Sequence, residues 1–151
     1  TDPESAVDTQ AILMRLVEIC ALLGGRVLVH GSPAQRRAID GENAANTQAR
    51  LTDFFAPIAT ASEVAGVTYC IEPLSRAETS VINTVAEGVA LVDRIGSPGF
   101  RTMLDTSAAG QSEAETVTNL LRSWLPTGKL AHVQVNDTNR GAPGMGRRLR
   151  P

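Results

Sequence analysis

Two carboxylates stand where one apolar segment of this chain ends. Residues 67–71 are β-branched, aromatic or otherwise apolar, a composition typical of a buried strand, and Glu72 follows them directly. Pro73 cannot donate to a sheet ladder and ends the strand, and Glu78 lies in the loop that follows. Parallel α/β proteins build their chemistry at the carboxyl ends of strands. Glu72 and Glu78 are therefore candidates for acid–base or metal chemistry.

Two more apolar segments end in polar side chains. Residues 100–104 run into Asp105, and residues 130–135 contain His132 and Gln134. Hard divalent cations take oxygen and imidazole ligands. Glu, Asp and His or Gln at three strand exits therefore predict the rim of a metal site.

Helical and strand patterns alternate along the chain. A helix is expected over 11–23, with Leu13, Leu16, Val17, Cys20 and Leu23 on one face. A second is expected over 43–63, kinked or broken at Pro57, a third capped by Asn83, and a fourth opened by the capping box at 112–115. Strands are expected over 26–30, 67–71, 100–104 and 130–135.

Four strands that alternate with helices imply a parallel sheet with right-handed crossovers. A closed (β/α)₈ barrel typically needs about 250 residues, and this chain has 151. The pattern therefore leaves two possibilities, a small open sheet or part of a barrel. We expect one domain over residues 1–151, with a Gly/Pro/Arg-rich tail from 136 to 151.

The composition excludes several classes of function. The net charge of −2 gives no general reason to bind nucleic acid, and aromatic residues make up only 3%. No run approaches the roughly 20 apolar residues of a membrane span, and no signal peptide is visible. Cys20 and Cys70 lie in apolar runs, which favours buried thiols in a reducing compartment over a disulfide. We expect a cytoplasmic protein.

Four stretches together resemble a known superfamily. They are residues 28–33, residues 71–74 with Glu78 and residues 83–84, residues 104–106, and residues 132–146 with Asp137 and Arg140. In this order and spacing they resemble the sugar phosphate isomerase/epimerase superfamily, the xylose isomerase-like TIM barrels, and within it the ketohexose 3-epimerase type. The resemblance implies an α/β chain that is a partial (β/α)₈ barrel. It would hold the fourth to seventh strands and lack the first three and the eighth.

The resemblance also implies roles for particular residues. Glu72 would bind the metal and move a proton, and Asp105 would be the second metal ligand. Glu78 and Arg140 would bind the substrate. The implied cofactor is Mn²⁺, Mg²⁺ or Co²⁺, which would polarise a ketose carbonyl.

This chain departs from the superfamily pattern at the metal. Gln134 stands where the superfamily has a histidine ligand, and Ala108 replaces another histidine. An amide oxygen is a weaker ligand than imidazole or carboxylate, so we expect a weakened site.

Three functions remain open from the sequence. The first is a sugar or sugar phosphate isomerase or epimerase, and the second is a non-catalytic relative that has lost the metal site. The third is a phosphodiesterase of the endonuclease branch, which is disfavoured because that branch uses several histidines and this chain has two. The expected partners are a small sugar or hydroxy-carbonyl compound and further copies of the chain, because an incomplete barrel has open sheet edges.

Overall fold

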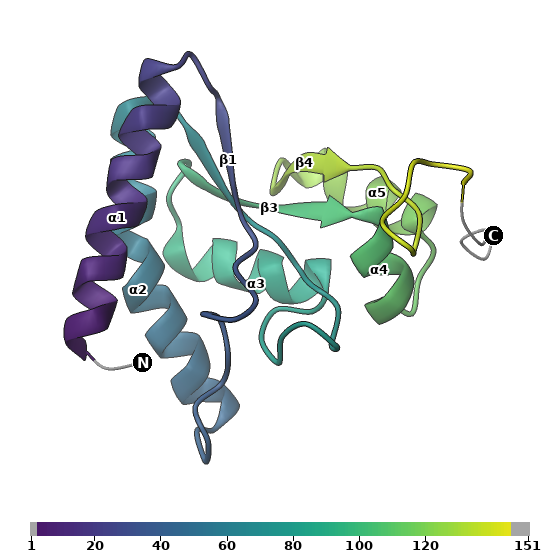
Figure 1. Ribbon diagram of the computed structural model, residues 1–151, viewed down its shortest axis with the longest axis horizontal. Coiled ribbons are helices and arrows are strands. Elements are labelled where there is room, and N and C mark those ends of the chain that lie inside the picture. The colour runs from purple at the N-terminus through teal and green to yellow at the C-terminus, as the bar shows by residue number, and fades with distance from the viewer. Residues whose placement is uncertain (1–2, 146–151) are drawn as a thin grey trace.

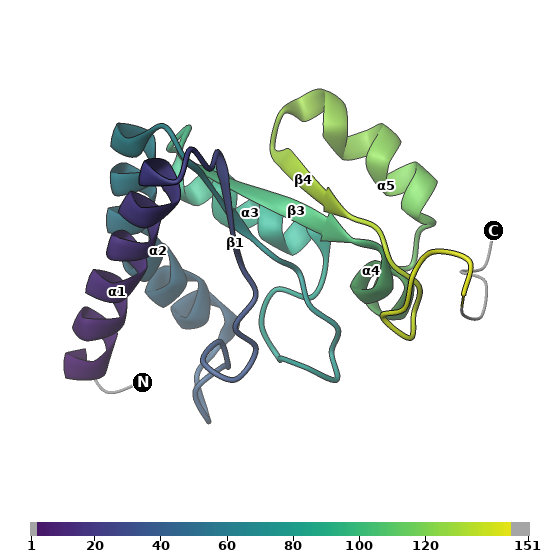
Figure 2. The same cartoon turned by 45° about the horizontal axis from the view of Figure 1, so that its top comes forward.

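A four-stranded parallel sheet organises the chain (Figures 1 and 2). The computed structural model describes residues 3–145. The strands lie in the order β1 (Val27–His30), β2 (Thr68–Ile71), β3 (Phe100–Asp105) and β4 (Leu130–Gln134). The helices are α1 (Pro3–Leu22), α2 (Ala44–Ala65), α3 (Val85–Ile95), α4 (Thr106–Ser112) and α5 (Val117–Trp124), and a short 3₁₀ turn, η1, covers Leu125–Thr127.

The helices cover one face of the sheet. Tyr69 and Ile71 of β2 pack with Val17 of α1 and Phe55 of α2, and Leu104 of β3 packs against α3 and α5. Side chains alternate between the two faces of a strand. Cys70 and Met103, which belong to neither of these clusters, therefore face the other side. This arrangement is half of a barrel wall, with helices outside and the strands' second face inside (Figure 2).

All four strands point the same way, so their carboxyl ends lie along one edge. His30 is level with Ile71, and Ile71 with Thr102. Asp105 is level with Gln134, after an irregularity between Thr102 and Met103. We call this edge, together with the loops that leave it, the rim. The expected α/β architecture with four parallel strands is confirmed.

The structure corrects several expected element boundaries. Helix α2 continues through Pro57 without interruption, so of the expected kink or break, the break is wrong. Thr84, and not Asn83, caps α3, because the Thr84 side chain accepts from the Glu87 N–H. Thr116, and not Ser112, caps α5 in the same way by accepting from Asn119 N–H.

Helix α1 is longer than expected, and its buried face matches the expected one only in part, through Leu13, Val17 and Cys20. Val17 is fully buried and Leu13 packs on the core, whereas Leu16 is 42% and Leu23 is 82% exposed. Helix α4 was not expected at all. Both cysteines are free thiols, Cys70 buried and Cys20 half-buried. In the part of the chain described here, no helix is both long and apolar enough to cross a membrane.

Residues 136–145 form turns that return to the rim. Thr106 Oγ1 donates to the carbonyl oxygen of Asn136 at 2.6 Å, and Ser107 Oγ donates to that of Thr138 at 3.2 Å. This part of the expected tail is thus anchored to the start of α4. Residues 146–151, including Gly146 of the matching stretch, lie outside the described residues.

Candidate active site at the rim

Glu72 is buried at the exit of β2. Its side chain belongs to a residue only 8% exposed, and its backbone N–H donates to the carbonyl oxygen of His30 at 3.1 Å. The first residue after β1 is Gly31, which leaves room for this carboxylate. A Cβ at Gly31 would lie only 2.7 Å from Glu72 Oε2. Burial raises the pKa of Glu72, and the charge of Asp105 raises it further. Arg36 and Arg140 oppose this rise.

Asp105 ends β3 and begins α4. Its Oδ1 accepts from the backbone N–H of Ala108 at 2.9 Å, as a helix N-cap does. Its Oδ2 accepts from Asn136 Nδ2 at 2.9 Å. The residue is 2% exposed, and these two bonds fix its carboxylate beside Glu72. Asp105 therefore caps helix α4 and also contributes negative charge to the rim.

Gln134 lies next to Asp105 at the end of β4. The two residues are directly level in the parallel ladder, so their side chains leave the sheet on the same face. Gln134 is half-buried. The neighbouring His132 is level with Met103, one pair further from the rim. Gln134 and Asp105 therefore lie side by side at the rim.

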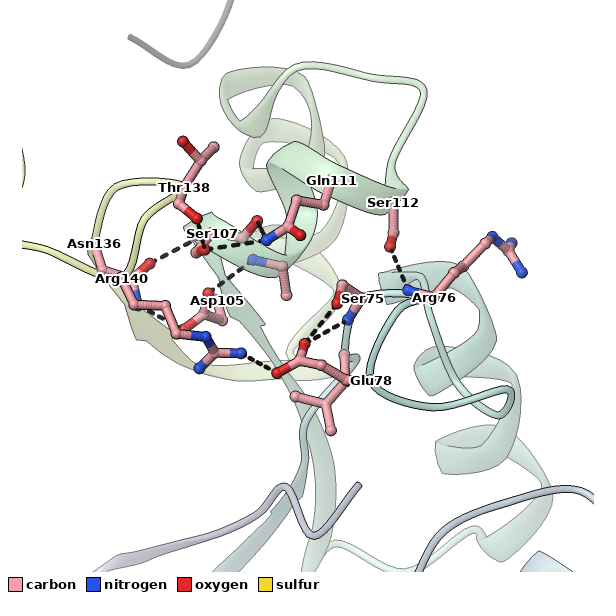
Figure 3. A network of polar contacts seen from close by, with 12 residues as sticks. Ser75, Arg76, Glu78, Asp105, Ser107, Gln111, Ser112, Asn136, Thr138 and Arg140 are labelled. Carbon is pink, nitrogen blue, oxygen red and sulfur yellow. Dashed lines mark hydrogen bonds and ion pairs between the residues drawn. The ribbon is translucent and has the colours of Figure 1, made fainter. Parts of the chain in front are cut away.

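Glu78 and Arg140 form an ion pair that joins two loops of the rim (Figure 3). Glu78 Oε2 accepts from Ser75 Oγ at 2.7 Å and from Ser75 N–H at 3.1 Å. Its Oε1 accepts from Arg140 Nη2. Figure 3 shows Arg140 reaching from the loop after β4 towards the loop after β2. Arg140 is thus held by a partner and is not simply part of a solvated basic tail.

Two further buried groups, His30 and Arg36, lie behind the rim. His30 Nδ1 lies 2.7 Å from the Tyr69 hydroxyl, and the imidazole packs edge-on against Phe55. Burial, and then the charge of Arg36, lower the pKa of His30 to about 4, so it is neutral at pH 7. Arg36 is itself buried, although nothing in its polar loop marks it in the sequence. Asn136 could have been found, because it is a polar residue two positions after the end of β4.

The rim offers part of a ligand set for a divalent cation. Glu72, Asp105 and Gln134 supply the oxygen donors that hard cations prefer. Within residues 3–145, however, no three His, Cys, Asp or Glu side chains come together as a metal cluster. The donors therefore fit such an ion by chemical type, and they make up an incomplete shell.

The helix-covered parallel sheet defines part of a TIM-barrel protein. The chain belongs to the xylose isomerase-like TIM barrel family, which it matches over residues 1–151.

Proteins of known function that resemble this chain are ketose 3-epimerases. D-psicose 3-epimerase of Agrobacterium fabrum is 39% identical over 82 residues, which cover 54% of this chain and 27% of the relative. L-ribulose 3-epimerase of Mesorhizobium japonicum is 30% identical over 136 residues, 89% of this chain and 44% of the relative. The chain thus spans at most about half the length of these relatives.

Solved structures agree with this assignment to a family. A structure of L-ribulose 3-epimerase superposes with a TM-score of 0.82 at 27% identity, covering 98% of this chain and 49% of that one. D-psicose 3-epimerase with D-tagatose, from Clostridium cellulolyticum, gives a TM-score of 0.81 at 25% identity, covering 97% and 50%.

Proposed function

We propose that this chain carries part of the active site of a ketose epimerase, which transfers a proton at the carbon next to a ketose carbonyl. The observation that carries the proposal is the buried Glu72 carboxylate beside Asp105 at the rim. The names of the relatives, psicose and ribulose 3-epimerases, support the reaction type and a sugar substrate. The free thiols of Cys20 and Cys70 are in keeping with work in the reducing cytoplasm.

Glu72 is the group that moves the proton in this proposal. A general base works best when its pKa lies near the operating pH. Burial and the Asp105 charge move the pKa of Glu72 upward in that direction, while Arg36 and Arg140 keep it from rising further. The carboxylate can then take a proton from carbon and return it.

Glu78 and Arg140 would orient the sugar. Glu78 Oε2 is fixed by Ser75, and Arg140 is half-exposed and pairs with Glu78 through Nη2. A guanidinium offers five N–H donors in a planar fork, so donors remain for sugar hydroxyls. The ion pair thus places one acceptor and several donors at the edge of the rim.

Glu72, Asp105 and Gln134 would hold a divalent cation, Mn²⁺, Mg²⁺ or Co²⁺. Such an ion, when bound, polarises the ketose carbonyl and makes the neighbouring C–H more acidic. Because Gln134 supplies only an amide oxygen, we expect these residues alone to hold it weakly.

The test is exchange of solvent deuterium into D-psicose. Epimerisation needs a second group on the opposite face of the carbon, so we expect negligible epimerisation by residues 1–151 alone. Exchange needs only one base, and we expect slow exchange, above the buffer rate, in the presence of Mn²⁺. It would be read by loss of the C3 proton signal in NMR.

Matched variants decide whether Glu72 is that base. Glu72→Gln should remove the exchange, whereas Glu113→Gln, at a carboxylate whose pKa burial also raises, should retain it. Exchange that is equal in the wild type and Glu72→Gln would contradict the proposal. Exchange no faster than in buffer would favour the other function weighed from the sequence, a relative with no catalysis.

A further inference from the structure

The loop that joins β2 to α3, residues 72–84, contains a strained backbone conformation. Ile82 has a φ of +59°, in the left-handed region that L-residues rarely adopt. A β-branched side chain makes this conformation a genuine outlier, and Ile82 is also buried. Such a conformation persists only where the surrounding structure holds it in place. The same loop carries both glutamates of the rim, Glu72 and Glu78.

Backbone strain in this chain is concentrated at the rim. Within residues 3–145, three residues other than glycine have a positive φ, namely Ser32, Ile82 and Arg140. They lie in the loops that leave β1, β2 and β4, at the carboxyl ends of those strands. Strained residues gather at functional sites, where they fix the groups that act. The strain at Ile82 therefore calls for the contacts that maintain it.

Asn83 supplies those contacts. Its side chain is buried, and Nδ2 donates to the carbonyl oxygens of Leu74 at 2.8 Å and of Thr79 at 2.9 Å. Both hydrogens of the side-chain amide are thus used. Its Oδ1 accepts from Arg76 Nη1 at 3.3 Å. The Leu74 N–H in turn donates to the Ile82 carbonyl oxygen at 3.1 Å, so three hydrogen bonds close the loop on itself.

These bonds fix the backbone beside each carboxylate. Leu74 lies two residues after Glu72, and Thr79 directly follows Glu78. The Thr79 N–H also donates to the carbonyl oxygen of Ser75 at 3.2 Å, and the Ser75 hydroxyl holds Glu78 Oε2. Figure 3 shows Ser75 and Glu78 facing each other in this loop. One carboxamide therefore fixes both parts of the loop that carry the glutamates.

The start of helix α3 does not account for the Asn83 side chain. Thr84 caps this helix, because its Oγ1 accepts from the Glu87 N–H at 3.2 Å. The Glu87 side chain accepts from the backbone N–H of Asn83, and not from its carboxamide. The carboxamide is therefore directed entirely to the loop.

We propose that Asn83 is a positioning residue, whose carboxamide holds the loop closed and thereby places Glu72 and Glu78 at the rim. Asn83 acts through these two residues and does not touch the substrate. The action of the two carboxylates on a sugar rests on the proposed function, whereas their placement by Asn83 does not.

The pKa of Glu72, followed by ¹³C NMR titration, reports its placement. Asn83→Ala leaves two carbonyl oxygens without a donor, so we expect the loop to open and Glu72 to become hydrated. Because burial is the largest cause of its raised pKa, the pKa should fall towards the usual value of a glutamate. Glu72-dependent deuterium exchange should fall roughly tenfold or more. Asn83→Ser keeps one short donor and should show the same shifts to a smaller extent.

Asn43→Ala is the matched control, because it removes an asparagine that caps α2 by accepting from the Asn46 N–H. It should lower the melting temperature and leave both the pKa of Glu72 and the exchange rate unchanged. If Asn83→Ala and Asn83→Ser keep the wild-type pKa of Glu72, or if Asn43→Ala shifts it as much as they do, the proposal is overturned.

A pair of variants at Ile82 tests the closed loop separately. Ile82→Gly and Ile82→Ala both delete the buried side chain, but only glycine adopts a positive φ without cost. Ile82→Gly should therefore melt at a higher temperature than Ile82→Ala. At the neighbouring Val81, which is also buried, the alanine variant should melt higher than the glycine variant. The same order at both positions would show that Ile82 is not held in the left-handed region, and would overturn the proposal.

The outcomes separate this inference from the proposed reaction. A pKa of Glu72 that depends on Asn83, with no deuterium exchange in the wild type, supports the positioning role and refutes the reaction. Glu72-dependent exchange that continues at the wild-type rate in Asn83→Ala refutes the positioning role alone.

Discussion

Burial shifts the pKa of two residues at the rim in opposite directions. Glu72 is pushed towards its neutral form by burial and by Asp105, and His30 is pushed towards its neutral form by burial and by Arg36. Both effects follow from the cost of a charge in an apolar environment. The sequence indicated Glu72 through its strand exit, but the environment of His30 comes from Tyr69 and Phe55, which only the fold brings to it.

We expect His30 to make the chain less stable in mild acid. Its pKa falls from 6.5 to about 4 on folding, so the unfolded chain binds more protons between these values. The neutral imidazole therefore adds no cost to the folded state above about pH 6.5. The free energy of unfolding then falls as the pH drops from 6.5 towards 4, because the unfolded chain gains a proton that the folded chain does not. Between pH 7 and pH 5 the free energy of unfolding should drop by about 2 kcal/mol from this residue alone.

Urea unfolding of the wild type and His30→Gln at several pH values measures this effect. The carboxylates titrate in both proteins, so the difference between the two curves isolates the histidine. A difference that stays constant from pH 7 to pH 5 would show that His30 is not held neutral.

At the scale of elements, the strands were predictable and the helix ends were less so. Short apolar segments between turn residues marked all four strands. Helix α4 was not predicted, because it is only seven residues long, follows directly after Asp105 and has no periodic pattern of apolar residues. Leu16 and Leu23 were wrongly assigned to the buried face of α1, because leucines and isoleucines occur on both sides of this helix. Which side is buried depends on the packing of the helix against the rest of the fold.

Helix α3 lies close to β3 because Gly88 has no side chain. A Cβ there would lie 2.3 Å from Thr102 Oγ1, which donates to the Ile71 carbonyl oxygen at 3.0 Å. Gly88→Ala should therefore destabilise the chain by about 1–3 kcal/mol through overpacking. Alanine is intrinsically more favourable than glycine in a helix by roughly 0.5–1 kcal/mol, and we expect the overpacking to outweigh this gain.

A double-mutant cycle checks this contact. Thr102→Ala removes the clashing hydroxyl, so the cost of Gly88→Ala should shrink in that background. Strict additivity of the two changes in unfolding free energy would mean that α3 is not in close contact with Thr102.

At the scale of the whole molecule, the sheet of residues 3–145 has two outer strands, β1 and β4. Helix α1 adds an exposed apolar stripe, formed by Ile12, Leu16 and Ile19, and Leu23 continues it just after the helix ends. A sheet edge and an apolar helix face both favour association with further chain. The open sheet edges could be predicted from the resemblance to a longer barrel. The exposed apolar stripe could be identified only from the structure.

We expect residues 1–151 to form a dimer or a larger assembly. Sedimentation velocity over a range of concentrations measures it. Leu16→Lys with Ile19→Lys should shift the chain towards monomer, whereas Val64→Lys, at a residue of α2 that is 85% exposed, should not. A single monomeric species, with a melting temperature independent of concentration, would argue against the assembly.

We propose that the exits of β2, β3 and β4 form part of a metal-dependent sugar site, and Mn²⁺ titration calorimetry tests this most directly. The wild type should bind weakly or not at all. Gln134→His should tighten binding at least tenfold, Asn119→His on the exposed side of α5 should not, and Glu72→Gln should abolish whatever binding exists. A sub-micromolar site in the wild type, or no change on Gln134→His, would contradict the account of this rim.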